Sequence, residues 1–416
     1  MRVIQVLCLA SVAAAVQKPL LTKDSCSWQP LSSVELTCHL DQDQQQAAPS
    51  SPTPKPAPPA SKWEATGKCA GTYCIFKNPG FANGRGMVAI TTSQNIKKLK
   101  ALEKATIGKA KTKSSPEQSP PPQFLISQIP GKGLGLISNV TLRRGDTIMR
   151  QSPAILLHRT FFEQIPPQIQ ASLLREAVSL LPPTLRKSFL GQMSHFPGDK
   201  ILSILATNSF QMDLGGAKDG HHYGNFPEVS RFNHDCRPNV AFRIDAKSLT
   251  HVTAAVRDVR PGEELSISYL DSMEPRAKRQ ERAKMAWGFE CACSQCSLPE
   301  KEAKKSDERL QEIKSIEGKL GDVTSGTKGV NKKMLERLVR LYREERLEGS
   351  MGGAYTLVAM NYNMLGDAKN AVKYAKLAAE AVELEMGEGQ PDAEVMRELV
   401  KDARGHFTWR GRIGMR

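Results

Sequence analysis

Residues 231–239 decide the fold of this chain, and they read Arg231-Phe232-Asn233-His234-Asp235-Cys236-Arg237-Pro238-Asn239. The lone cysteine of this stretch gains three partners further along, in Cys291-Ala292-Cys293-Ser294-Gln295-Cys296. Four thiolates are a preferred ligand set for zinc, which they hold tetrahedrally in a closed structural site. Disulfides are the competing interpretation, but cysteines as close in sequence as Cys291 and Cys293 bridge poorly. We therefore predict one zinc ion bound by Cys236, Cys291, Cys293 and Cys296.

Two further motifs accompany this stretch in a fixed order. A glycine-rich segment, Gly131-Lys132-Gly133-Leu134-Gly135-Leu136, precedes it, and Gly262-Glu263-Glu264-Leu265-Ser266-Ile267-Ser268-Tyr269 follows it. Glycine lacks a Cβ atom and adopts positive φ, so a glycine-rich backbone can approach a ligand closely. Taken alone, these glycines would indicate an ordinary turn. Their position just ahead of the other motifs favours a ligand-binding loop.

Together the ordered segments resemble the SET-domain protein methyltransferases, and most closely the fungal SET proteins that share a core with the SET-and-MYND group. The resemblance spans residues 122–297. It implies transfer of a methyl group from S-adenosylmethionine to a protein lysine, histone or non-histone. The resemblance also implies which residues contact the cofactor: Lys132, Gly133, Leu134, Gly135, Asn208, Asn233, His234, Tyr269 and Phe289.

The resemblance assigns individual roles within this set. Tyr269 is the expected catalytic residue, orienting the sulfonium methyl and the incoming amine, and the alternative is a tyrosine packed in the core. His234 is expected to fix local geometry, and it is not assigned as a general base. Phe289 matches an aromatic residue that packs on the adenine. Cys291, Cys293 and Cys296 match a post-SET element whose thiolates join Cys236 around zinc.

Two positions depart from the usual pattern of the family. Asp235 stands where serine is usual, and we expect its carboxylate to pair with Arg231 or Arg237. Trp287 stands where many active relatives carry a second tyrosine lining the lysine channel. Tryptophan is bulkier and offers an N–H donor, so the methylation state and even the activity of this chain could differ.

The composition is that of a globular protein with a basic surplus. The chain has 416 residues, 40% of them hydrophobic, and a formal net charge of +15. Much of the positive charge lies in residues 97–113, which we interpret as a solvated linker or helix face in preference to a binding patch. We expect a monomer that acts on a protein substrate, without direct nucleic-acid binding and without a membrane span.

The N-terminus and its cysteines leave the cellular compartment open. Residues 1–17 contain a short apolar run ending in small residues, as in a secretory signal peptide, and the alternative is an apolar helix or strand docked on the body. Methyltransferase chemistry instead suggests the nucleus or cytoplasm. A second set of four cysteines is compatible with two disulfides in any of three connectivities; it comprises Cys26, Cys38, Cys69 and Cys74.

Periodicity and turn residues divide the chain into regions. Residues 18–121 form an N-terminal appendage, with extended linkers at 41–61 and 114–122 and a hairpin-like element at 69–92. Residues 122–271 form the SET domain, with a helical insertion at 161–205 that lacks the cysteines of a MYND module, and residues 287–297 form the zinc-binding element. The expected strands of the SET domain lie at 124–126, 135–137, 146–149, 154–157, 239–244, 249–256 and 264–269.

Residues 302–416 read as helical throughout, with a helical hairpin that resembles one tetratricopeptide unit. The predicted fold class is thus α+β: a β-rich SET core of the β-clip type with a helical insertion, a post-SET zinc site and a tetratricopeptide-like C-terminal domain. The leading function is protein-lysine methylation. The alternative is a non-catalytic, zinc-stapled interaction scaffold.

Overall fold

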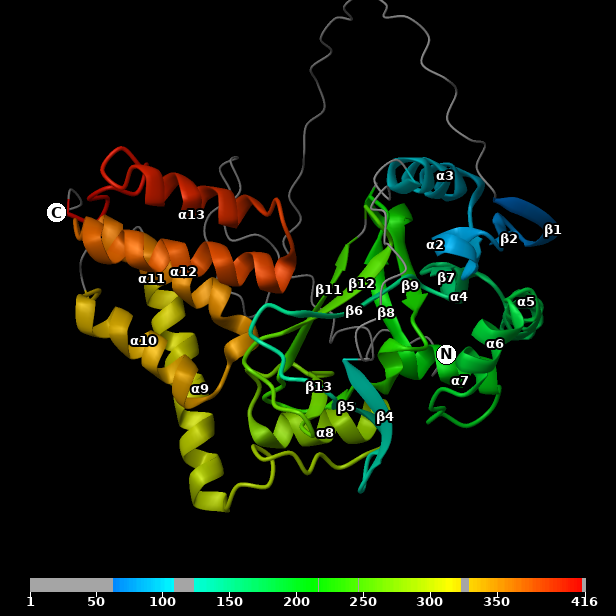
Figure 1. Ribbon diagram of the computed structural model, residues 1–416, viewed down its shortest axis with the longest axis horizontal. Coiled ribbons are helices and arrows are strands. Elements are labelled where there is room, and N and C mark those ends of the chain that lie inside the picture. The colour runs from blue at the N-terminus through cyan, green and yellow to red at the C-terminus, as the bar shows by residue number, and fades with distance from the viewer. Residues whose placement is uncertain (1–62, 108–122, 216, 246, 323–328, 414–416) are drawn as a thin grey trace, which may run out of the picture.

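The computed structural model describes residues 63–107, 123–215, 217–245, 247–322 and 329–413. The predicted signal peptide at 1–17, Cys26, Cys38 and the two linkers lie outside these residues. In the described part of the chain, three β-sheets occupy the middle of the molecule, with one group of helices on each side (Figure 1). The architecture is therefore α+β, as predicted.

The largest sheet has six strands in the order β1-β2-β3-β7-β9-β8. The expected hairpin at 69–92 supplies its first strands, and a disulfide joins Cys69 to Cys74 across the turn between β1 and β2. β3 pairs parallel with β7, so the N-terminal segment is built into the same sheet as strands of the SET region. The strands are β1 (Glu64–Ala70), β2 (Tyr73–Asn78), β3 (Met87–Thr91), β7 (Ile155–His158), β9 (His221–Asn225) and β8 (Ser209–Asp213).

The helical insertion covers one face of this sheet. Apolar side chains of the sheet, such as Ile90 and Leu157, pack with Leu174 and Phe189 of the helices in one buried cluster. Burial of this apolar surface is what holds the insertion on the sheet. The short α2 (Phe81–Gly84) and α3 (Ser93–Ile107) pack on the opposite face, where Phe81, Ile96 and Leu99 share a second buried cluster with Ala89 and Leu156 of the sheet. The insertion comprises α4 (Phe161–Gln164), α5 (Pro167–Ser179), α6 (Pro183–Leu190) and α7 (Lys200–Asn208).

Two smaller sheets carry the motifs of the predicted site. One has the order β10-β13-β5-β4 and the other β11-β12-β6. All seven predicted strands of the SET region are found, with ends that differ by a few residues. The four-stranded sheet comprises β10 (Asn233–His234), β13 (Glu264–Ile267), β5 (Gly133–Ser138) and β4 (Phe124–Ile129); the three-stranded sheet comprises β11 (Val240–Asp245), β12 (Thr250–Ala255) and β6 (Thr147–Gln151).

The C-terminal helices form a separate apolar core on the opposite side of the sheets (Figure 1). α11 is buried along almost its whole length, and the rings of Tyr362 on α11 and Tyr374 on α12 stack 5.5 Å apart. α8 begins beside α9, where the Arg276 N–H donates to Asp307 Oδ1 at 3.0 Å, and it ends at Trp287, whose indole donates to the Thr207 carbonyl of the helical insertion. The helices are α8 (Arg276–Trp287), α9 (Glu300–Gly321), α10 (Lys332–Glu344), α11 (Met351–Met364), α12 (Ala368–Met386) and α13 (Pro391–Lys401).

The end of the chain is not helical, contrary to the prediction that the tail is helical throughout. Residues 402–413 form turns. Tertiary contacts hold this segment: the buried Arg412 guanidinium donates to the carbonyls of Leu320 and Asp322 at the end of α9 and to Asn361 Oδ1 on α11, all at 2.8–2.9 Å. No helix among the described residues is long and apolar enough to cross a membrane.

Candidate functional site

The four cysteines predicted to bind zinc converge in one buried cluster. All four sulfurs lie within 4.8 Å of one another, with Cys236 Sγ 4.0 Å from Cys291 Sγ and 3.6 Å from Cys296 Sγ. A tetrahedral zinc ion with Zn–S bonds of about 2.3 Å places its sulfurs about 3.8 Å apart. The donor set and the spacing therefore both fit a tetrahedral metal site.

Local interactions shape the loop that carries Cys291, Cys293 and Cys296. α8 ends at Gly288 with φ +74°, and a Cβ atom there would lie 2.1 Å from the ring of His195. Gln280 on α8 then holds the loop with its amide: Nε2 donates to the Cys291 carbonyl at 2.8 Å, and Oε1 accepts from the Cys291 N–H at 2.9 Å. Glycine is required at position 288 because both the conformation and the space exclude a side chain.

A buried cation lies beside the sulfur cluster. Arg279, on α8, is only 1% exposed. Burial lowers the pKa of its guanidinium, but the neighbouring sulfurs of Cys236 and Cys296 outweigh burial, and the net shift is upward. Four thiolates around a zinc ion carry a net charge of about −2, and a buried charge requires a partner. With a zinc ion bound, Arg279 would supply that positive charge.

The Asn233–Asn239 segment is anchored to the strand that ends near Tyr269. β10 runs parallel to β13, with Asn233 opposite Ser266 and His234 opposite Ile267. At the other end of the segment, Asn239 Nδ2 donates to the Glu264 carbonyl at 2.8 Å, and its Oδ1 accepts from the Ser266 N–H at 2.9 Å. Two motifs that are separate in the sequence are thereby fixed side by side.

His234 links Tyr269 to the cysteine cluster. Its Nδ1 accepts from the Tyr269 N–H at 3.0 Å, and its Nε2 lies 3.3 Å from Cys236 Sγ. The bond to Tyr269 explains why β13 ends at Ile267, short of the predicted position 269. Burial lowers the pKa of His234 to about 4. The ring is therefore neutral at physiological pH, with its proton on Nε2 facing the sulfur.

Tyr269 lies within a group of aromatic rings. Its ring centroid is 5.4 Å from His234, 5.3 Å from Trp287 and 6.4 Å from Phe289. Its hydroxyl donates to the carbonyl of Phe232 at 2.5 Å. Burial, followed by the negative charge of Glu264, raises the pKa of the phenol well above its ordinary value. The phenol is therefore protonated, and its oxygen retains lone pairs for a further contact.

Trp287 and Asn208 connect this aromatic group to the helical insertion. Trp287 Nε1 donates to the carbonyl of Thr207 at 3.1 Å. The next residue, Asn208, uses its amide nitrogen within the insertion, donating to the carbonyls of Met193 and Ile204 at 2.8 Å each. The Asn208 side chain therefore also holds the end of α7 and the loop before it in place.

The glycine-rich segment lies against Asn233. A Cβ atom on Gly135 would be 2.5 Å from Asn233 Nδ2, so glycine makes room for the asparagine. Asn233 Nδ2 donates to Glu264 Oε1 at 3.0 Å, and Lys132 Nζ pairs with Glu264 Oε2 at 2.7 Å. Glu264 thus joins the glycine-rich segment to the Asn-His motif. The side chain of Leu134 is exposed.

The expected ion pair of Asp235 with an arginine is wrong. Asp235 Oδ1 accepts from the backbone N–H of Arg237 at 2.8 Å, which stabilises the turn before Pro238. Arg231 instead donates to the Gly191 carbonyl, and Arg237 pairs with Glu345. Burial raises the pKa of Asp235 to about 6. The family serine is thus replaced by a residue that makes a local backbone bond.

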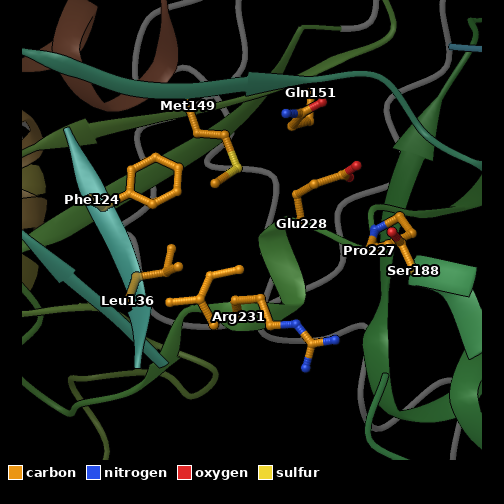
Figure 2. A pocket seen from close by; sticks show the side chains of 9 residues that line it. Phe124, Leu136, Met149, Gln151, Ser188, Pro227, Glu228 and Arg231 are labelled. Carbon is orange, nitrogen blue, oxygen red and sulfur yellow. The ribbon is translucent and has the colours of Figure 1, made fainter. Parts of the chain in front are cut away.

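A cavity of about 220 Å³ is lined in part by Arg231, the residue that precedes Phe232. Figure 2 shows the apolar side chains of Phe124, Leu136 and Met149 on one side of it, facing Glu228 and Arg231. Pockets that enclose drug-sized ligands typically measure about 300–1,000 Å³. This cavity is therefore too small to hold a nucleoside-sized cofactor by itself.

Several residues of the site have no motif in the sequence. Arg279 and Gln280 lie in a charged helix whose periodicity does not distinguish them. Gln295 lies between two cysteines and was not assigned a role. Glu345 is 108 residues from Arg237, to which it hydrogen-bonds. No sequence signal singles out these residues, because their partners lie in other segments of the folded chain.

Comparisons with known proteins agree with the geometry. Residues 133–270 match the SET domain. "Histone-lysine N-methyltransferase set5" of Schizosaccharomyces pombe is 27% identical over 293 residues, 69% of this chain and 86% of the relative. "N-lysine methyltransferase SMYD2" of Gallus gallus is 36% identical over 86 residues, 20% of this chain and 19% of the relative.

One solved structure is described as "ctPRC2 in an autoinhibited conformation bound to S-adenosylmethionine". It covers 68% of this chain and 33% of that chain at 13% identity, with a TM-score of 0.21, which is too low to support a structural statement. The chain thus contains a region that matches the SET domain, at residues 133–270, and it is similar to lysine methyltransferases of the Set5 and SMYD2 types.

Proposed function

We propose that this chain is an S-adenosylmethionine-dependent protein-lysine N-methyltransferase. One observation carries the proposal: Tyr269, His234, Trp287 and Phe289 form one aromatic group, and the Asn-His motif at its edge contacts Gly135 of the glycine-rich segment. These residues come from four separate parts of the sequence. Their convergence is what a cofactor cleft next to a narrow lysine channel requires.

When bound, S-adenosylmethionine would supply a methyl group on a positively charged sulfur for attack by a neutral lysine amine, with the thioether leaving and the lysine proton passing to solvent. The protein contributes alignment, which can lower the barrier by several kcal/mol. Tyr269 would take part in this alignment: its proton is directed to the Phe232 carbonyl, which leaves its oxygen able to accept C–H contacts from the methyl group.

The cofactor would be held by backbone and rings more than by charged side chains. Lys132 Nζ is already paired with Glu264, so Lys132 and Gly133 would contribute their backbone. Asn233 and His234 would bind through backbone groups, and the Phe289 ring, 5.9 Å from His234, offers a stacking surface for the adenine. This assignment keeps His234 as a fixed, neutral residue.

The four cysteines would hold a structural zinc ion. Their burial and spacing favour a closed tetrahedral site, and a closed site leaves no position for water or substrate. The metal would therefore stabilise the loop that carries Phe289 without taking part in the reaction. Arg279 would balance the charge of the site.

The C-terminal helices would form one wall of the substrate groove. The hairpin of α11 and α12 turns at Gly366, with φ +76°, and its two tyrosine-bearing faces meet. This arrangement resembles a single tetratricopeptide-like unit flanked by α10 and α13. The substrate is a protein lysine, and its identity would depend on the surface of this wall.

A non-catalytic scaffold is the second candidate, and Trp287 favours it. The indole occupies the position of a second channel tyrosine and uses its N–H on the Thr207 carbonyl. A scaffold would retain the zinc site and the fold while lacking methyl transfer. The two candidates differ in one observable: only the methyltransferase would consume S-adenosylmethionine.

Calorimetric titration of the full chain with S-adenosylmethionine, with zinc measured on the same sample, tests the proposal. We expect saturable binding at one site, about one zinc per chain, and transfer of labelled methyl groups to core histones or to a lysine peptide library. Absence of cofactor binding by a folded, zinc-loaded protein would overturn the enzyme and leave the scaffold.

A further inference from the structure

A buried carboxylate from the C-terminal helices reaches the cysteine-bearing segments. Glu345 follows directly after α10, and its side chain is 0% exposed. Arg237, whose side chain is 1% exposed, pairs with it: Nη2 lies 2.7 Å from Glu345 Oε2, and Nε donates to the Glu345 backbone carbonyl. Charged groups this deeply buried need partners, because water no longer solvates them.

The remaining partners of Glu345 come from two other segments. Its Oε2 also accepts from Ser306 Oγ at 2.8 Å and from Gln295 Nε2 at 3.2 Å, and its Oε1 accepts from Arg309 Nε at 2.7 Å. Burial alone would raise the pKa of Glu345, but the hydrogen bonds from Arg237 and Ser306 reverse this, and the net shift is downward. The carboxylate is therefore ionised and fully bonded.

Two of these partners are direct neighbours of the sulfur ligands. Arg237 follows Cys236, and its Nη1 donates to the Cys236 carbonyl at 2.8 Å and to the Ser272 carbonyl at 3.1 Å. Gln295 precedes Cys296. One carboxylate thus holds both segments that carry the four cysteines. The segment of Cys236 also carries Asn233 and His234.

The neighbouring residue of the same turn adds a second contact. Arg346 has φ +51°, a left-handed conformation that a non-glycine residue rarely adopts. In this conformation its Nη2 donates to Ser294 Oγ at 2.9 Å, within the cysteine loop. The turn after α10 is thus shaped to face that loop with both of its side chains.

We propose that Glu345 is a positioning residue of the cysteine site and the adjoining cofactor cleft. It acts through Arg237 and Gln295, and it makes the C-terminal helices part of the site although they contribute no ligand and no reacting group. The inference about the cleft rests on the proposed function, whereas the inference about the cysteine site rests on the four-sulfur cluster alone.

Outer residues that orient metal ligands typically affect metal affinity or activity by about 10- to 100-fold. Glu345→Gln keeps the shape of the side chain and removes the charge, which leaves Arg237 buried without its counter-ion. We therefore expect about 10- to 100-fold faster zinc release to a colorimetric chelator and a similar rise in the dissociation constant for S-adenosylmethionine.

The matched control is Glu344→Gln, one residue earlier. Glu344 is 40% exposed and pairs with Arg337 and Arg340 at 3.6 and 3.9 Å on the surface of α10. Exposed pairs of this kind contribute little to stability. We expect Glu344→Gln to match the wild type in zinc release, cofactor affinity and melting temperature.

A double variant separates positioning from stability. Glu345→Gln destabilises because it leaves the buried Arg237 without a counter-ion, so adding Arg237→Met, which removes that buried charge, should recover part of the melting temperature. If Glu345 positions the site, zinc release stays fast in the double variant. If Glu345→Gln alone fails to fold, zinc release is measured on the double variant instead.

One outcome would overturn the inference. If Glu345→Gln or the double variant melts at a lower temperature but releases zinc and binds cofactor like the wild type, the ion pair is merely structural. Wild-type protein that holds zinc but binds no S-adenosylmethionine would instead count against the proposed function, and the zinc-release comparison would still decide the role of Glu345.

Discussion

Replacing Tyr269 by phenylalanine removes one hydroxyl and keeps the ring. The ring should remain between His234 and Trp287, whose centroids lie 5.4 and 5.3 Å away. The hydroxyl now donates to the Phe232 carbonyl at 2.5 Å, and a buried carbonyl that loses its donor costs about 1–3 kcal/mol. We therefore expect a folded variant whose free energy of unfolding is lower by about 1–2 kcal/mol.

The effect on catalysis should be separate from this loss of stability. A C–H contact to oxygen contributes about 0.5–1 kcal/mol, so a methyl group held by two or three such contacts loses about 2 kcal/mol of transition-state stabilisation. This amounts to roughly a 30-fold lower rate. Because burial keeps the phenol of Tyr269 protonated, its raised pKa predicts no titration of this group near neutral pH. The pH–rate profiles of the wild type and Tyr269→Phe should therefore have the same shape.

The assay is single-turnover transfer of labelled methyl groups, with cofactor affinity measured by calorimetry on the same preparations. Tyr374→Phe is the control, because Tyr374 packs on Tyr362 in the C-terminal helices, away from the cleft. A Tyr269→Phe rate within about twofold of this control, well short of the roughly 30-fold loss expected, would refute the reasoning. A slower rate explained entirely by weaker cofactor binding would also refute it.

Three further changes test other parts of the structure. Cys293→Ser should lower the zinc content measured by atomic absorption and expose the loop after α8 to hydrogen exchange, and an unchanged metal content would contradict the four-cysteine site. Gly135→Ala places a Cβ atom 2.5 Å from Asn233 Nδ2 and should weaken S-adenosylmethionine binding in calorimetry, unlike alanine at Gly145, which has free space but strained positive φ. Burial raises the pKa of Glu385 from 4.5 to about 8, so the unfolded state loses its proton at lower pH than the folded state does. The free energy of unfolding should therefore fall as pH rises from about 5 to 8, by up to roughly 1.4 kcal/mol per pH unit. Thermal melting of Glu385→Gln should show a weaker pH dependence, and an unchanged slope would show that Glu385 does not cause it.

The pairing of the N-terminal cysteines illustrates what a sequence leaves open. Three connectivities were possible for Cys26, Cys38, Cys69 and Cys74, and spacing could not choose among them. The hairpin of β1 and β2 places Cys69 opposite Cys74, and these two form a disulfide. Strand register decides the pairing because it fixes which side chains share one face.

Long-range partners were the main gap in the prediction of the fold. Short motifs predicted the strands of the SET region and the insertion helices, because turn residues and periodicity are local signals. The parallel pairing of β3 with β7 was not predicted. Nothing local distinguishes a strand that joins a distant sheet from one in an isolated hairpin, so the N-terminal segment was expected as an appendage.

The sequence by itself determined the chemistry available to this protein: the four cysteines, the Asn-His motif, the glycine-rich segment and Tyr269 are chemically distinctive residues in a specific order. Only the tertiary structure decided their partners. It directs the Tyr269 proton to Phe232, gives Asp235 a backbone bond in place of an ion pair, and brings Glu345 to Arg237 across 108 residues. A motif records which groups are present, whereas hydrogen bonds and ion pairs depend on distances of a few ångströms that only the packed chain establishes.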